Sequence, residues 1–364
     1  MTLPPQASIL LALRACAALT ILWHHYALYA PFRDWAAPLI GETLDWLANY
    51  ARATQVFFVV GGYVAAKTIG RRQWGLRELG RFAVQRYCRL GLPYLAVVVL
   101  IIPIYAFARG WVPDEVLGSE VGLGQFLAHL FFLQDILGYE SLSAGLWFVC
   151  INFQLSFGYA FSLALQGRFG RGGDGLFTAI GWGAALISLF HFNLDPAADS
   201  WALYFFPYFF MGILVQRALE RGSQTEFLLF QAVLLVAMLF EWRWRLVIAM
   251  VFGALLFVAE RSALARHWSP GRLVTGLGHI SFSLFLIHFP VLILVSTVWS
   301  RLGWDSAEAA VGGLLAAFLM SLLTAVAFYR WVEQPSARLS RYFRASERLD
   351  ARGERAVRRM AFEN

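Results

Sequence analysis

The sequence predicts an all-α integral membrane protein with about ten transmembrane helices and both termini in the cytoplasm. Three observations support this fold class. The chain of 364 residues is 59% hydrophobic and only 15% charged, whereas soluble domains are about half apolar and about a quarter charged. Apolar runs long enough to cross a bilayer recur along the chain. Basic and acidic loops alternate between these runs, which is typical of multi-pass membrane proteins.

The apolar runs define the predicted spans. They cover residues 8–30, 50–69, 84–108, 143–166, 175–192, 201–218, 226–241, 243–260, 278–299 and 308–331. The connection 67–89 contains seven basic residues and one acid, and the next loop, 109–142, contains one Arg and five acids. Later loops continue this alternation, with the short turn at Arg243 and Arg245 as the exception. The positive-inside rule therefore places the basic loops and both termini in the cytoplasm.

The predicted organisation is a transmembrane domain over 1–337 and a basic cytoplasmic tail over 338–364. The tail is expected to lie as an amphipathic helix near anionic membrane lipids of the inner leaflet. The first apolar run has neither a basic leader nor a small-residue cleavage site and is expected to remain as a span. Segment 122–137 is apolar but short and contains His129 and Asp135, which predicts an interfacial or re-entrant helix on the outer side.

Cysteine content and net charge exclude several function classes. Cys16, Cys88 and Cys150 are odd in number and lack metal-ligand spacing, so neither a disulfide framework nor a metal site is expected. The net charge of +7 reflects the loops and the tail, so no nucleic-acid partner is expected. Any chemistry is therefore expected inside the membrane bundle.

Arg14 and His25 lie eleven residues apart in the first predicted span. This is close to three helical turns, so the side chains point along nearly the same face, about 16 Å apart. Ionisable residues within a span are costly, face the bundle interior and mark functional sites. A neutral imidazole can accept a hydroxyl proton, so His25 is a candidate base near the outer face. The structural alternative is a buried Arg with a hydrogen-bonded His, and the adjacent His24 is a competing imidazole.

A basic segment precedes the third predicted span. Arg81, Arg86 and Arg89 lie at its inner mouth, followed by Tyr94. Guanidinium groups bind phosphates in a forked geometry, so nucleotide phosphates are candidate ligands. The alternative for the three arginines is an ordinary basic collar on the cytoplasmic side, and for Tyr94 an interfacial anchor.

Four further segments carry candidate residues. Gly61 and Gly62 permit either close helix packing or a passage for a thin chain. Trp147, Asn152 and Gln154 offer an aromatic platform and amide groups for a sugar, or an aromatic belt with interhelical hydrogen bonds. The last two spans carry His288, which is structural by default, and Glu333, a possible counter-ion to Arg330 or to the arginine cluster.

Read together, these segments resemble the membrane acyltransferase-3 family of bacterial O-acyltransferases. Its motifs appear in order over Arg14 to Pro335. They are Arg14-x10-His25, Phe57 to Tyr63, the group Arg86, Arg89, Pro93 and Tyr94, Ile280 to Pro290 with His288, and Glu333-Gln334-Pro335. Two positions depart from the family pattern. An acidic pair common in relatives is replaced by Asn152 and Phe153, and Gly61 replaces a Ser.

The resemblance implies transfer of an acyl group, usually acetyl from acetyl-CoA, to a sugar hydroxyl. It implies that His25 is the base with Arg14 as its partner, and that Arg81, Arg86, Arg89 and Tyr94 bind the donor. His24, Trp147, Asn152, Gln154 and His288 are the expected acceptor-binding residues. The expected acceptor is a lipid-linked exopolysaccharide repeat unit at the bacterial inner membrane, as in xanthan-type acetyltransferases. Direct transfer and a transient acyl-enzyme on His25 both remain open.

A second hypothesis is a glycan or lipid transporter, or flippase, that uses the polar bundle as a passage. The sequence shows no inverted repeat and no paired broken helices, which are typical of many transporters. The two hypotheses differ in whether mutation removes acetate or exported polymer.

Overall fold

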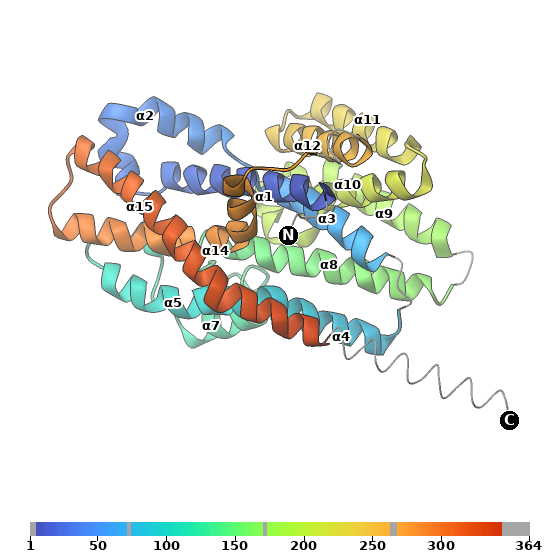
Figure 1. Ribbon diagram of the computed structural model, residues 1–364, viewed down its shortest axis with the longest axis horizontal. Helices are drawn as coiled ribbons and strands as arrows, with labels where there is room; N and C mark the ends of the chain where they lie inside the picture. The colour runs from blue at the N-terminus through green and yellow to red at the C-terminus, as the bar shows by residue number, and fades with distance from the viewer. Residues whose placement is uncertain (1–4, 71–73, 170–172, 263–267, 344–364) are drawn as a thin grey trace.

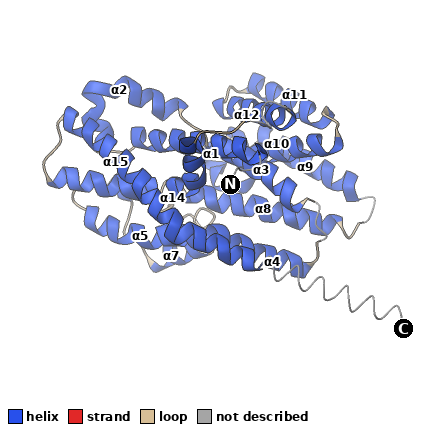
Figure 2. Cartoon of the chain, in the orientation of Figure 1, coloured by secondary structure: helices blue, strands red, loops and turns tan. Residues whose placement is uncertain are grey.

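The computed structural model describes residues 5–70, 74–169, 173–262 and 268–343, and these residues form helices and loops without a strand (Figures 1 and 2). The α-helices are α1 Pro5–Leu28, α2 Phe32–Tyr50, α3 Thr54–Ile69, α4 Leu76–Arg86, α5 Leu92–Ala108, α6 Asp114–Leu117, α7 Leu123–Leu130, α8 Leu146–Gln166, α9 Gly173–Phe190, α10 Ala202–Arg221, α11 Thr225–Phe240, α12 Trp244–Arg261, α14 Arg272–Arg301 and α15 Ala307–Phe328. Two π-helical turns, η1 Tyr87–Gly91 and η5 Tyr329–Glu333, and two 3₁₀ turns, η3 Phe192–Leu194 and η4 Pro196–Ser200, are also present. Residues 334–343 continue as a helix after η5.

The all-α integral membrane class is confirmed. Within the described ranges, seven helices are long and apolar enough to cross a membrane. They are Ile9–Leu28, Leu76–Ala108, Leu146–Gln166, Gly175–Leu194, Ala202–Arg221, Arg272–Arg301 and Ala307–Phe343. The other three predicted spans correspond to α3 and α11, with 16 residues each, and to α12, which carries three charged residues in 18. The predicted count of ten is therefore not confirmed.

Helix α2 lies in a stretch that hydropathy left outside the predicted spans. Its sequence is amphipathic, and its buried positions Phe32, Ala36, Leu44 and Ala48 repeat at multiples of four residues. It packs against α1 and α15 and is kinked near Pro38. Its polar face and its proline hide it from a search for long apolar runs.

The centre of the bundle is held by close backbone contacts. Gly62 of α3 lies against the backbone of Phe209 in α10, and Gly212 of α10 lies against Val59 of α3. A Cβ at either glycine would overlap a backbone carbonyl oxygen. Small residues let membrane helices approach in this way. At Gly62 the structure therefore corresponds to the packing alternative and not to a passage.

Helix α1 packs against α14, which also packs against α15. Gly278 permits the α1 contact, because a Cβ there would approach Leu11 O at 2.6 Å. Helices α1 and α15 thus share the partner α14, so the first and the last of these α-helices lie in the same part of the bundle (Figure 1). The first predicted motif therefore meets the last two in space.

The outer segment after α6 folds back along α5. Three tyrosines of η1 and α5 donate hydrogen bonds to it, namely Tyr105 to Leu142 O at 2.7 Å, Tyr94 to Gln134 Oε1 at 3.3 Å and Tyr87 to Leu130 O at 2.7 Å. Tyr87 and Tyr105 are 18 residues apart, which corresponds to about 27 Å of helix. Of the segment 122–137, only Leu123–Leu130 is α-helical. Its interfacial or re-entrant position in the membrane stays a prediction.

His129 connects two parts of this segment through hydrogen bonds. Its Nδ1 lies 2.8 Å from Gln125 O, and the backbone N–H of Leu142 donates to its Nε2 at 3.1 Å. Nδ1 therefore carries the proton. His129 is fully buried, and both of its ring nitrogens have a hydrogen-bond partner.

Both π-helical turns end two residues before a proline. Pro93 follows η1 and Pro335 follows η5, and neither can donate the backbone hydrogen bond to the residue four positions earlier. The backbone instead closes with bonds from Leu92 N to Tyr87 O and from Gln334 N to Tyr329 O. Such widened turns are frequent at functional sites.

Candidate active site

His25 and His288 form a pair across the α1–α14 contact. His25 Nδ1 lies 2.7 Å from His288 Nε2, and the two rings are nearly parallel with centroids 5.0 Å apart. His288 is 1% exposed, whereas His25 is partly accessible. The first helix motif thus meets the late His motif directly.

The hydrogen bonds of His288 determine the tautomers of both rings. His288 Nδ1 lies 3.1 Å from Leu284 O, which can only accept, so Nδ1 carries the proton of the neutral ring. His288 Nε2 is then an acceptor, and His25 Nδ1 must donate to it. The remaining nitrogen, His25 Nε2, keeps its lone pair. This arrangement directs the basic nitrogen of His25 away from His288 and makes it available to take a proton.

His25 lines a cavity of about 330 Å³, within the size range of small-molecule sites. The cavity lies between the C-terminal ends of α1 and α5, the N-terminal end of α8 and the loops between α5 and α8. Its lining combines aromatic, hydroxyl, amide and carboxylate side chains. Apart from His25, these polar and aromatic residues are Tyr29, Tyr105, Glu115, Ser119, Gln125, Glu140, Ser141, Ser143, Trp147 and Phe289.

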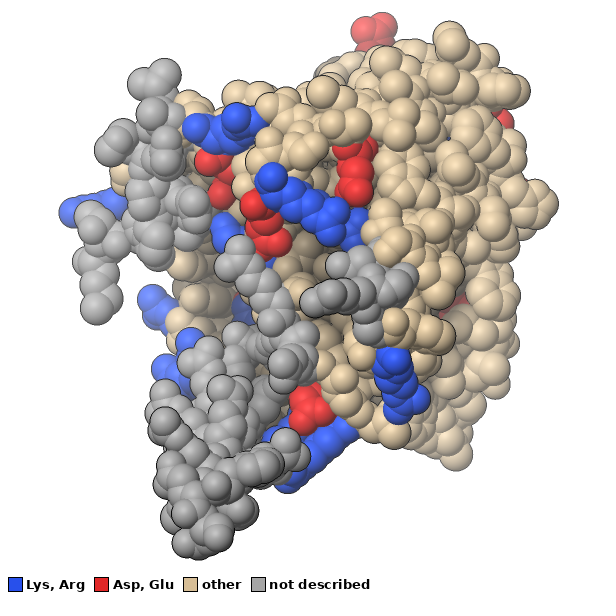
Figure 3. Space-filling model, turned by 90° about the vertical axis from the view of Figure 1, so that its right-hand side faces the viewer, with Lys and Arg blue, Asp and Glu red and all other residues tan. Residues whose placement is uncertain are grey.

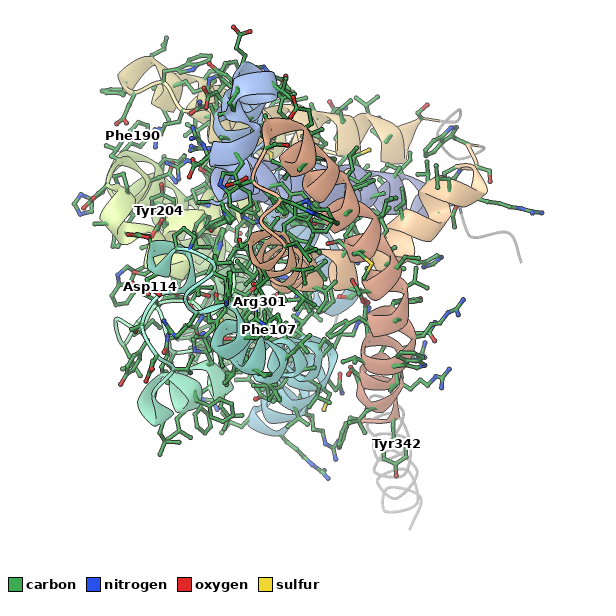
Figure 4. The ribbon with its side chains drawn as sticks, turned by 90° about the vertical axis from the view of Figure 1, so that its left-hand side faces the viewer. Phe107, Asp114, Phe190, Tyr204, Arg301 and Tyr342 are labelled. Carbon is green, nitrogen blue, oxygen red and sulfur yellow. The ribbon has the colours of Figure 1, made fainter. Side chains whose placement is uncertain are left out.

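A second cavity of about 430 Å³ adjoins the first and shares Glu115, Gly118, Ser119 and Glu140 with it. Arg109 and Asp114 complete its lining. Figure 4 looks onto this end of the molecule, where the guanidinium of Arg301 lies over the ring of Phe107 and Asp114 lies to one side of them. The predicted topology makes this end the outer face.

A polar cluster lies at η1 and η5, toward the predicted cytoplasmic side of the bundle. Arg89 Nη2 lies 3.1 Å from Glu333 Oε1, and Ser283 Oγ donates to Glu333 Oε2 at 2.6 Å. Glu333 is 1% exposed, so the ion pair and the hydrogen bond compensate its buried charge. The charges of Glu333 and Arg89 also act on Arg14. Both members of the ion pair lie on π-helical turns, so these turns fix where the two charges meet.

The other predicted donor-binding arginines lie toward the same end. Arg86 Nη2 donates to Ser156 Oγ of α8 at 2.7 Å. Figure 3 shows Lys and Arg side chains gathered on this end of the molecule, together with some acids. Several are paired, such as Lys67 with Glu260 at 3.7 Å and Arg217 with Glu226 at 3.6 Å. The basic collar and the candidate phosphate site therefore share one face.

Other predicted site residues lie apart from the cavity around His25. His24 Nδ1 contacts Leu47 O of α2 at 3.2 Å. Gln154 donates to Phe132 O at 3.4 Å, and Asn152 Oδ1 is buried against α3 without a hydrogen bond. Tyr94 is fully buried against the segment 122–137. Of the predicted acceptor-binding residues, the structure brings Trp147 and His288 together with His25.

Sequence reasoning did not identify the loop residues that line the cavity. Ser143 is 1% exposed, and its Oγ is buried without a hydrogen-bond partner. Glu115 and Glu140 appeared in the sequence only as acids of an outer loop. Because their positions depend on how the segment after α6 folds back, no local spacing reveals them. The one available signal was the concentration of polar residues in 139–145, just before a span.

No group of three or more His, Cys, Asp or Glu side chains with metal-binding geometry occurs in the part of the chain that the structure describes. Around His25, the cavity lining offers hydroxyl, amide and carboxylate groups beside the imidazole.

Comparison with known proteins agrees with the ordered motifs. No curated protein and no solved structure gave a match. The family model described as an acyltransferase domain matches residues 10–330, which include His25, the segment 122–137 and His288. The apolar helices show that the chain is a multi-pass membrane protein. Because the family model matches most of its length, the chain belongs to the membrane acyltransferase-3 family.

Proposed function

We propose that this protein is an inner-membrane O-acetyltransferase of bacteria that moves acetyl from acetyl-CoA to a sugar hydroxyl of a lipid-linked exopolysaccharide repeat unit. The observation that carries the proposal is His25. Its free Nε2 belongs to a ring held by His288 and lines a cavity at the predicted outer face. Family membership supplies the reaction class.

The reaction begins with the acceptor hydroxyl in the cavity. His25 Nε2 takes the hydroxyl proton while the oxygen attacks the thioester carbonyl carbon. The C–S bond then breaks, the ester forms, and the proton on His25 passes to the departing thiolate. His288 positions the ring and stabilises the imidazolium through the His25 Nδ1–H donor. An acyl-enzyme on the same nitrogen is the alternative route.

The donor is expected to approach from the opposite end. Arg81, Arg86 and Arg89 lie on or next to α4 and η1, and guanidinium groups suit the phosphates of coenzyme A. Arg14 continues this positive region toward His25, about 16 Å farther along α1. The acyl arm would therefore extend through the bundle interior to reach the base.

The test compares cells that carry wild type, His25→Ala or His191→Ala at matched membrane levels. His191 is an exposed outer-loop His, so its variant controls for the loss of an imidazole. We expect His25→Ala to remove acetate from the exported polysaccharide with normal polymer yield, and His191→Ala to leave both unchanged.

The same experiment distinguishes acyl transfer from the transport hypothesis. Loss of polymer with normal acetate per repeat would favour a transporter or flippase. Normal acetate and normal polymer in His25→Ala would contradict the assignment of His25 as the base.

A further inference from the structure

The charges around the cavity bear on which sugar can enter it, an inference that rests on the proposed function. Glu115 and Glu140 line both adjoining cavities, and neither carboxylate has a hydrogen bond or an ion pair with a described residue. Glu140 Oε2 lies beside Gly118, and a Cβ added at Gly118 would lie 2.7 Å from this oxygen. Both carboxylates are thus available to a ligand.

Positive charge does not offset these carboxylates. Arg109 is the one Lys or Arg among the residues that line the two cavities. Its guanidinium donates to Gly118 O at 3.2 Å and contacts Asp114 Oδ1 at 3.4 Å. With Asp114 set against Arg109, Glu115 and Glu140 leave the lining with two negative charges in excess.

Ser143 is an independent sign that a polar ligand binds here. It lines the cavity, it is 1% exposed, and its Oγ has no hydrogen-bond partner. A buried hydroxyl left unpaired costs free energy unless a ligand or water satisfies it. Trp147 adds an aromatic face to the same cavity. These groups fit a polyhydroxylated ligand.

We infer that the sugar residue presented to His25 carries no negative charge. Ionised carboxylates only accept hydrogen bonds, so they can pair with hydroxyl or amine donors and repel a uronate or an acidic substituent. A cavity of about 330 Å³ is about 9 Å across if roughly spherical, close to the screening length of about 8 Å at physiological ionic strength. A carboxylate on the acceptor therefore remains within the field of both glutamates.

The experiment uses the purified full-length protein, acetyl-CoA and two soluble acceptors, a methyl hexoside and the matching methyl hexuronoside. We expect kcat/KM for the neutral sugar to exceed that for the uronate by about threefold or more, because Glu115 and Glu140 are exposed and solvent screens part of the repulsion. The variant Glu115→Gln/Glu140→Gln should narrow this ratio by about threefold or more, and added salt should narrow the wild-type ratio. Glu120→Gln, an exposed acid of the same loop outside both cavity linings, should leave the ratio unchanged.

Equal use of the two acceptors, preference for the uronate, or an unchanged ratio in the double variant would overturn the inference. Failure to acetylate either sugar would count against the proposed function instead. Equilibrium binding of the same glycosides without acetyl-CoA then still tests charge selectivity. Thermal unfolding confirms that each variant is folded.

Discussion

At the scale of single residues, the contact between His25 and His288 gives the clearest prediction. His288 acts through His25, because its Nε2 accepts the Nδ1–H of that ring. We expect His288→Phe to lower kcat by about tenfold or more, because it removes the acceptor that fixes the tautomer of the base. His288→Gln, which retains an acceptor oxygen, should recover part of the rate.

A purely structural role of His288 would make both variants equally slow and equally unstable. Single-turnover rates and thermal unfolding of the two proteins separate these cases. His279→Ala provides the control, because His279 is exposed on the same helix.

Asp135 gives a prediction about pH. Burial raises the pKa of Asp135 to about 6, the negative charge of Asp199 adds to this, and a hydrogen bond from Gln134 opposes it. The unfolded chain has a pKa of about 3.9, so the folded protein binds the proton more tightly and loses stability as pH rises from about 4 through about 6. We expect Asp135→Asn to raise Tm at pH 7.5 and to change it little at pH 4.

The control for this prediction is Asp305→Asn, at an exposed outer acid. It should give the same small change at both pH values. A rise in Tm of Asp135→Asn that is equal at both pH values would contradict the role of the buried charge.

Single residues also show how far sequence reasoning reached. Arg14 and His25 were identifiable because a charged or imidazole side chain within an apolar run is costly, whatever the tertiary structure. His288 became a candidate only through the family resemblance. The pairing of His25 with His288 was not identifiable, since 263 residues separate them and only helix packing brings them together. Ser143 carries no such signal, because a hydroxyl near the end of a span is ordinary.

At the scale of helices, the contact between α3 and α10 depends on glycine. Gly62→Ala places a methyl group against a backbone oxygen of Phe209, which cannot move without displacing α10. We expect it to destabilise the protein by about 1–3 kcal/mol or more. Gly158→Ala in α8 is the matched control, because no atom lies within 4 Å of its added Cβ.

Unfolding of the detergent-solubilised variants in parallel measures both effects. Gly158→Ala should be neutral or slightly stabilising, because alanine favours the helix. Equal stability of the two variants would show that α3 and α10 do not depend on this close approach.

The helices also show why some elements were predictable and others were not. Long apolar runs gave the positions of α1, α8, α9, α10, α14 and α15, since hydropathy alone determines them. Helix α2 was missed because half its surface is polar. The π-helical turns follow from Pro93 and Pro335, which are visible in the sequence, but the meeting of Arg89 with Glu333 required the packed bundle.

At the scale of the whole molecule, the alternation of loop charges predicts the orientation in the membrane. After replacement of the native cysteines by alanine, we expect Asp305→Cys to react with a membrane-impermeant maleimide in spheroplasts. Ser223→Cys should react only after the membrane is permeabilised. Both positions are exposed. Ser223 follows the end of α10 in a predicted cytoplasmic loop, whereas Asp305 lies between α14 and α15 in a predicted outer loop. The reverse pattern would invert the topology and place the cavity around His25 on the cytoplasmic side.

The predicted outward position of this cavity has a consequence for charge balance across the bilayer. Under the proposed reaction, coenzyme A departs on the cytoplasmic side and the new ester on the other, so the acetyl group is exported during the transfer itself. The acetyl group carries a formal charge of +1 when it leaves the thiolate and moves outward. Because His25 returns the hydroxyl proton to the thiolate, one proton moves inward in exchange. The overall transfer is therefore electroneutral. We expect the initial rate in sealed vesicles to be the same under potassium diffusion potentials of either sign. A rate that follows the voltage would mean that the proton escapes to the external solution.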